Sequence, residues 1–113
     1  MDNALTQLAA EFSGVPSEQL KDAALLSGLL IAAANAAGFS PVGVPTVRTQ
    51  AGDGVSAMLL MAGSHLALHA FPHRETLLLD IVGPASHDFR KAVDVFARRL
   101  SARDIKSDIR GRG

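Results

Sequence analysis

The sequence predicts an α+β fold: a two-layer sandwich in which a mostly antiparallel sheet carries two helices on one face. Three observations predict it. Residues 65–71 read His-Leu-Ala-Leu-His-Ala-Phe, and this period of two is typical of a strand. Residues 22–37 and the segment after Ser86 have the composition or the spacing of helices. Further strand-like runs lie between them, in the order β-α-β-β-β-β-α-β, so packing both helices on one sheet face is the simplest arrangement.

The first half of the chain supplies a strand and the first helix. A weak strand candidate at residues 5–12 is followed by a connection at residues 14–20. The helix begins near Lys21 or Asp22 and ends at Ala37, because Asp22 is a suitable N-cap and Gly38 a natural C-terminal stop. Its surface is apolar all round, so we expect neighbours on more than one side.

The second half supplies four strands, one helix and a final strand. The segments are an edge strand at 39–50 interrupted by Pro41 and Pro45, a turn at 51–54, strands at 55–62, 65–71 and 76–82, and a short strand around Ile105 and Ile109 before a polar tail. We expect Ser86 to cap the second helix. Phe89, Val93, Phe96 and Leu100 recur at helical spacing, which predicts the face that packs on the core.

Composition excludes several classes of protein. The 113 residues fit a single domain, residues 1–113. Eleven basic residues balance eleven acidic ones, so nothing indicates a nucleic-acid or membrane partner. Cysteine is absent, which excludes disulfides, a thiolate nucleophile and a cysteine-based zinc site. The chain starts without the basic residues of a signal peptide, and we expect a cytoplasmic protein.

Residues 63–72 hold most of the candidate chemistry, and two kinds of site can be set aside. His65, His69 and His73 are spaced by four, as metal ligands on a helix would be. On a strand, however, His65 and His69 lie about 13 Å apart, too far to share one ion, so we expect no metal. A Ser-His-Asp hydrolase built on Ser64 and Asp80 lacks the G-x-S-x-G motif. Each histidine alone also fits a hydrogen-bonded structural role, and Asp80 fits a strand-end carboxylate.

Four motifs, in order along the chain, resemble the bacterial S-adenosylmethionine decarboxylase proenzyme family. They are Gly54-Val55-Ser56, Ser64-His65-Leu66, His69-x-Phe71-Pro72 and Leu79-Asp80-Ile81. The family reads approximately G-V-S, then E-S-H-L-x-I-H-T-W-P-E, then V-D-V-F-T-C-G. The likeness continues in Glu11-Phe12, the helix ending at Gly38, Phe89-Arg-Lys-Ala92 and Ile109-Arg-Gly-Arg, and so spans almost the whole chain.

The resemblance implies an enzyme that makes its own cofactor, a pyruvoyl group derived from Ser64. In the family, the serine hydroxyl attacks the preceding carbonyl and the chain breaks, here between Gly63 and Ser64. His69 matches the histidine assigned to processing, and Ser56 the serine that assists it. The ketone then accepts the electrons left when carbon dioxide departs. The resemblance further implies a homodimer with active sites at the interface, and S-adenosylmethionine as substrate for spermidine synthesis.

The chain departs from the family pattern at four positions. Gly63 replaces the glutamate before the serine, and Pro84 stands where the catalytic cysteine is expected. His73 replaces a glutamate, and Gln50 replaces an aromatic residue that stacks on adenine. We therefore expect His73, His65 or His87 to supply the proton that the cysteine would give.

These departures keep two alternatives open. The same cofactor can act on another amino acid, such as ornithine or arginine, so the partner is a small-molecule amine or amino acid. Alternatively, the chain is a paralogue that never cleaves and acts as a binding or regulatory protein.

Overall fold

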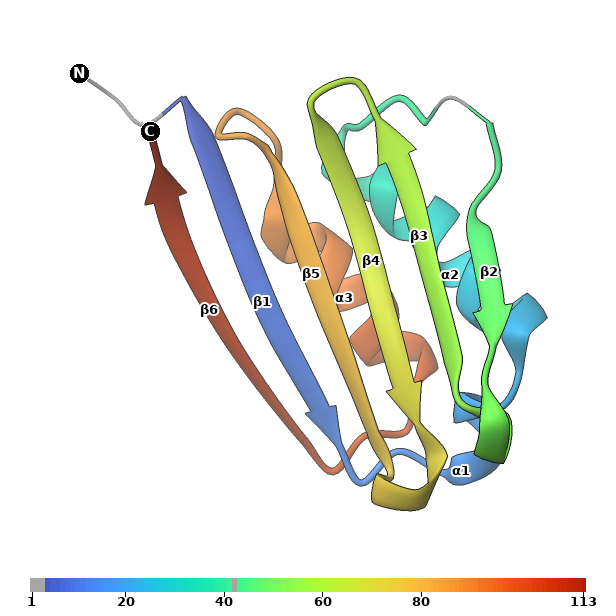
Figure 1. Cartoon of the computed structure of the whole chain (residues 1–113). Helices are drawn as coiled ribbons and strands as arrows, with labels where there is room; N and C mark the ends of the chain where they lie inside the picture. Colours follow the sequence, from blue (N-terminus) through green and yellow to red (C-terminus); the bar gives the residue numbers. More distant parts are fainter. Residues whose placement is uncertain (1–3, 42) are drawn as a thin grey trace.

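The computed structural model describes residues 4–41 and 43–113, and they form one antiparallel sheet covered by helices (Figure 1). The strand order is β2-β3-β4-β5-β1-β6, and every neighbouring pair is antiparallel. The strands are β1 (Leu5–Ser13), β2 (Thr46–Thr49), β3 (Val55–Met61), β4 (Ser64–Phe71), β5 (Thr76–Pro84) and β6 (Asp104–Arg112). The helices are α1 (Ser17–Leu20), α2 (Ala23–Ala37) and α3 (Phe89–Arg99). The predicted α+β sandwich and its order of elements are confirmed.

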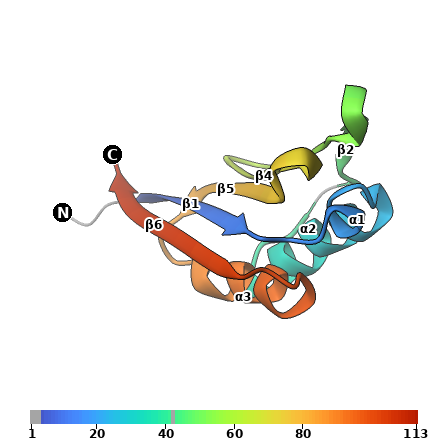
Figure 2. The same ribbon diagram turned by 90° about the horizontal axis from the view of Figure 1, so that it is seen from below.

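The two long helices lie on the same face of the sheet, and the opposite face is open (Figure 2). Alternate residues of each central strand point into the helix layer and are buried. They include Leu8, Phe12, Leu59, Leu66, Leu68, Leu79 and Ile81, which pack with Leu26 and Leu30 of α2 and Phe96 of α3. Within residues 4–41 and 43–113, no helix has the length and apolar run needed to cross a membrane.

The two long helices begin at aspartate caps, one predicted and one not. The Asp22 carboxylate accepts the backbone N–H of Leu25 at 3.0 Å, as expected for the start of α2. The predicted cap of the second helix, Ser86, is wrong. Ser86 lies in the turn after β5, and the Asp88 carboxylate accepts the N–H of Lys91 at 3.2 Å instead.

The ends of the chain and the predicted edge strand differ from expectation. The connection at 14–20 contains the short helix α1, and the tail after Ile109 continues β6 as far as Arg112. The whole of β6 pairs with β1, so the backbone groups on its β1 side are hydrogen-bonded even though its residues are mostly polar. Of the predicted strand at 39–50, only Thr46–Thr49 pairs. Its residue 42 and the chain start at 1–3 lie outside the described residues.

Removing the α2 cap is expected to destabilise the protein modestly. Asp22→Ala leaves the Leu25 N–H without its side-chain partner and lowers the free energy of unfolding by about 1 kcal/mol. Asp22→Asn keeps an accepting oxygen and serves as the control, with a loss of only a few tenths of a kcal/mol expected. Urea unfolding followed by circular dichroism measures both. Equal losses for the two variants would contradict the capping role.

Candidate active site

Ser64 begins β4 directly after a two-residue turn, and its side chain points into the helix layer. Residues 62 and 63 join β3 to β4, and Gly63 has φ 68°, a left-handed conformation that favours glycine. Met61 pairs with Ser64 across the hairpin. Ser64 is 6% exposed, and it is the buried polar residue among the described residues.

The wall beside Ser64 is formed by Gly83 and an aromatic stack. A Cβ atom on Gly83 would lie 2.6 Å from the Phe39 ring and 3.1 Å from Ser64 Oγ. The Phe39 ring stacks on His87, with centroids 4.2 Å apart, and meets Phe89 edge-on at 5.9 Å. The ring therefore has little room to move, and the backbone at Gly83 can approach it because no side chain intervenes.

A second group, on the open face, joins Gln50, Ser56 and His69. Ser56 and His69 are directly paired across β3 and β4, and Ser56 Oγ lies 2.7 Å from His69 Nδ1. Gln50 Nε2 donates to Ser56 Oγ at 3.1 Å. The sequence motifs identified Ser56 and His69. They did not indicate that Gln50 touches the pair.

The predicted processing residues are not all brought together within one chain. Ser64 and His69 are five residues apart on β4, so their side chains point to opposite faces of the sheet. Their positions along the strand differ by about 17 Å. Ser56 and His69 therefore form a pair, and Ser64 is separate from it.

A third group runs across four strands of the open face. His65 Nε2 lies 2.8 Å from Asp80 Oδ2, and Gln7 Nε2 donates to Asp80 Oδ1 at 3.0 Å. Arg112 Nε donates in turn to Gln7 Oε1 at 3.1 Å. Sequence reasoning missed Gln7 and Arg112, since residues 105 apart give no local pattern. Asp80 lies within β5 rather than at a strand end.

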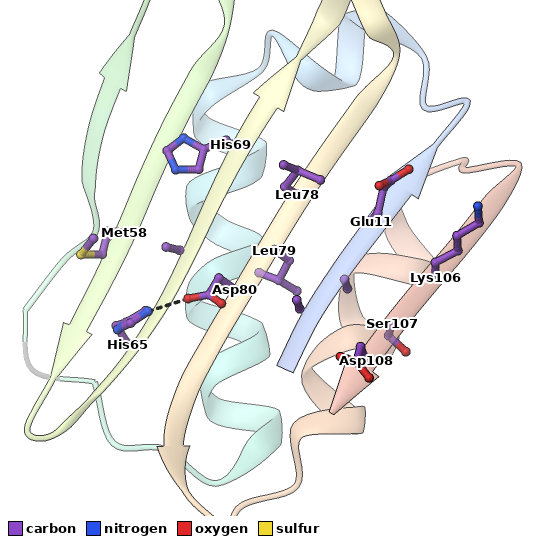
Figure 3. A pocket seen from close by; sticks show the side chains of 13 residues that line it. Glu11, Met58, His65, His69, Leu78, Leu79, Asp80, Lys106, Ser107 and Asp108 are labelled. Carbon is purple, nitrogen blue, oxygen red and sulfur yellow. Dashed lines mark hydrogen bonds and ion pairs between the residues drawn. The ribbon is translucent and has the colours of Figure 1, made fainter. Parts of the chain in front are cut away.

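The open face is hollowed between these two polar groups (Figure 3). The hollow has a volume of about 620 Å³, within the range of small-molecule sites. Its polar lining comes from Glu11, His65, His69, Asp80, Lys106, Ser107 and Asp108. Apolar lining comes from Met58 and Leu78, which are about two-fifths exposed, together with alanines and Leu79. The hollow therefore combines an apolar floor with mostly acidic edges.

The chain is similar in sequence to proteins of one known family. The model of the S-adenosylmethionine decarboxylase family matches residues 6–113, nearly the whole chain. The chain belongs to this family. Its curated relatives include an arginine decarboxylase proenzyme of Aeropyrum pernix, 36% identical over 93 residues, which cover 80% of this chain and 70% of the relative. The predicted family and the predicted enzyme class, a pyruvoyl-dependent decarboxylase, are confirmed.

The fold agrees with a solved member of the same family. The adenosylmethionine decarboxylase of Aquifex aeolicus VF5 superposes with a TM-score of 0.87, covering 100% of this chain and 93% of that one. The two sequences are 19% identical, so this match establishes the fold alone. It confirms the predicted two-layer architecture for this member of the S-adenosylmethionine decarboxylase family.

The three carboxylates that line the hollow, Glu11, Asp80 and Asp108, differ in their partners. Asp108 forms an ion pair with Arg110 at 2.8 Å, and its hydrogen bond and charge raise the pKa of the Arg110 guanidinium. Glu11 stands opposite Lys106 in the register of β1 and β6. Asp80 contacts no lysine or arginine of the described residues. Asp108 is therefore neutralised by Arg110, whereas the partners of Asp80 are His65 and Gln7.

The three histidines expected to donate a proton lie at different ends of the sheet. His65 follows Ser64 in β4, and His87 lies behind the Phe39 ring beside Ser64. His73 lies in the turn after β4, at the other end of the strand, with Nε2 3.1 Å from where a Cβ on Gly52 would be. The described residues contain no cluster of ligands that could hold a metal ion.

A side chain at Gly83 is expected to displace the Phe39 ring that packs beside Ser64. Gly83→Ala forces the Phe39 ring away from the strand and lowers the free energy of unfolding by about 1–3 kcal/mol. Gly28→Ala is the matched control, because Gly28 is an exposed residue inside α2 with nothing within 4 Å of the new methyl group. It is expected to gain up to about 1 kcal/mol from helix propensity. Chemical denaturation of both variants measures the difference, and a Gly83→Ala protein as stable as the wild type would contradict the tight contact.

Proposed function

We propose that the chain cuts itself between Gly63 and Ser64 and then decarboxylates a small cationic amino acid, with arginine the best supported. The observation that carries the choice of substrate is Asp80, a carboxylate of the hollow that contacts His65 and Gln7 but no lysine or arginine of the described residues. The reaction class follows from the family. The cleavage, its position and the substrate are parts of the proposal.

The local structure at Ser64 fits a pyruvoyl precursor. Ser64 Oγ attacks the Gly63 carbonyl carbon, the amide C–N bond breaks, and an ester forms. Elimination then leaves residues 1–63 as a carboxylate, and water replaces the Ser64 nitrogen, which departs as ammonia. Gly63 adopts the left-handed turn conformation before the serine, and Gly83 places no side chain of its own beside the hydroxyl. The resulting pyruvoyl group supplies an electron sink for decarboxylation.

A homodimer would complete the processing site. Within one chain, His69 and Ser56 lie on the opposite face from Ser64 and about 17 Å along the strand. A second copy, packed against the open face, can bring its own Ser56 and His69 to the end of β4 where the turn at residues 62–63 holds the bond to be cut. Met58, Leu60 and Leu78 leave apolar area exposed on this face, which supports such packing.

Three observations support arginine over an adenosyl substrate. The Aeropyrum relative is named an arginine decarboxylase proenzyme. Gln50 stands where the family has the aromatic residue that stacks on adenine. Asp80 lies in the hollow on the open face, where its carboxylate can form a charged hydrogen bond with a guanidinium.

His65 is the best supported proton donor of the three candidates. It adjoins Ser64 in sequence, borders the hollow and is oriented by its hydrogen bond to Asp80. His87 is stacked against Phe39 on the helix side. S-adenosylmethionine remains the second candidate substrate, because the hollow has the volume and the apolar floor for a larger ligand.

Self-cleavage is tested by the denatured mass of freshly purified protein, repeated after borohydride. We expect two chains, residues 1–63 and 64–113, with the second carrying a reducible carbonyl in place of its amine. Ser64→Ala should remain intact, while Ser56→Ala and His69→Ala should slow the appearance of the fragments. A wild-type chain that stays whole on ageing would favour the non-cleaving paralogue and defeat the proposal.

The substrate is tested by carbon dioxide release from arginine, ornithine and S-adenosylmethionine. We expect arginine to give the highest kcat/KM. Asp80→Asn removes the charge facing the guanidinium and should raise the KM for arginine about 10- to 100-fold, the effect of losing one charged hydrogen bond. Asp108→Asn is the control, since Asp108 is already paired with Arg110, and a change below about threefold is expected. Preference for S-adenosylmethionine, unaltered by Asp80→Asn, would overturn the assignment.

A further inference from the structure

We propose that Gln50 is a positioning residue that fixes which nitrogen of His69 carries the proton. In this arrangement, His69 Nδ1 accepts a hydrogen bond from Ser56 and Nε2 bears the hydrogen. The importance of this for catalysis rests on the proposed function, but the effect on the imidazole itself does not.

The backbone around Gln50 is held by the tight loop between β2 and β3. The Gln50 N–H donates to the Gly54 carbonyl at 2.7 Å, and the Gln50 carbonyl accepts the N–H of Asp53 at 3.0 Å. Gly52 and Asp53 both have positive φ, 80° and 64°, which closes the loop. Gln50 is therefore fixed at both backbone groups, so its side chain starts from a defined position next to Ser56.

One direction of the hydrogen bonds uses the Ser56 hydroxyl proton within this group; the alternative, in which Ser56 accepts from both Gln50 and His69, leaves that proton without a partner in the group. The amide nitrogen of Gln50 can only donate, so Ser56 Oγ accepts at 3.1 Å. The single hydroxyl proton of Ser56 is then free to point at His69 Nδ1, 2.7 Å away. A ring nitrogen that accepts carries no hydrogen, and the neutral imidazole must hold its proton on Nε2.

The direction of the Ser56–His69 hydrogen bond determines whether the other ring nitrogen of His69 donates or accepts a proton in the hollow. With its hydrogen on Nε2, the ring offers a donor to an oxygen atom, such as the carbonyl oxygen that gains charge when a serine attacks. With the hydrogen on Nδ1, the same ring would offer a lone pair and act as a base. Gln50 therefore sets His69 as a donor, a role that an aromatic residue at this position could not enforce.

Two substitutions at Gln50 distinguish the effect of its hydrogen-bond donor from the effect of the bulk of its side chain. Gln50→Glu keeps the length of the side chain but presents only acceptors, so Ser56 must donate to it and accept from His69 Nδ1–H. Gln50→Met keeps the bulk and removes the polar group, leaving the Ser56–His69 pair without an imposed direction. Gln7→Glu is the matched control, because it makes the same chemical change beside Asp80, on the other polar group of the open face.

The experiment is nitrogen-15 NMR of the side chains in the full chain carrying Ser64→Ala, which stays uncut whatever the fate of the Gly63–Ser64 bond. Long-range nitrogen–proton spectra at a pH where His69 is neutral distinguish a protonated from an unprotonated ring nitrogen. The signals of His69 are assigned by their loss in His69→Gln. Backbone amide spectra show that each variant is folded.

We expect His69 to be predominantly protonated at Nε2 with Gln50 present, at Nδ1 in Gln50→Glu, and mixed in Gln50→Met. Gln7→Glu should leave His69 protonated at Nε2. An Nδ1-protonated His69 beside Gln50, or no inversion in Gln50→Glu, would overturn the proposal. If the chain that retains Ser64 never cleaves, the proposed function falls while the result for His69 stands, since the measurement involves no processing.

Discussion

The alternation of side chains along β4 is the constraint on which the rest of the site depends. Adjacent residues of a strand point to opposite faces, so Ser64 lies in the helix layer and His65 on the open face. The same rule separates Ser64 from His69, five residues later. One chain thus presents a buried hydroxyl at one end of β4 and a hydrogen-bonded imidazole on the other face.

The two faces of the sheet differ because helices pack on only one of them. Burial of the leucines and phenylalanines under α2 and α3 provides the main stabilisation. The two helices cover the Ser64 face over the central strands, while Ile105 and Ile109 of β6 on the same face stay more than a third exposed. The open face receives no such cover and keeps polar side chains beside Met58 and Leu78. A hollow with acidic edges is the result, and it suits a cationic ligand better than a neutral one.

The departures from the family pattern gain meaning from their surroundings. Gln50 replaces an aromatic residue, yet it hydrogen-bonds the Ser56–His69 pair that the family pattern retains. Pro84 ends β5 and offers no proton, whereas His65 nearby is held by Asp80. The changes are therefore consistent with an altered substrate and an altered route for protons in a conserved fold.

The sequence by itself determined the order of elements, the caps at Asp22 and Gly38, the alternation of residues 65–71 and the family motifs, because these depend on neighbours within a few positions. It misplaced the α3 cap at Ser86, since Ser86 and Asp88 are both good caps and only the turn after β5 selects one. Only the tertiary structure decided that Gln7, Asp80 and Arg112 meet, and that Ser64 and His69 do not. Those relations arise from strand pairing and from the face each residue occupies, and pairing between distant segments leaves no local pattern in the chain.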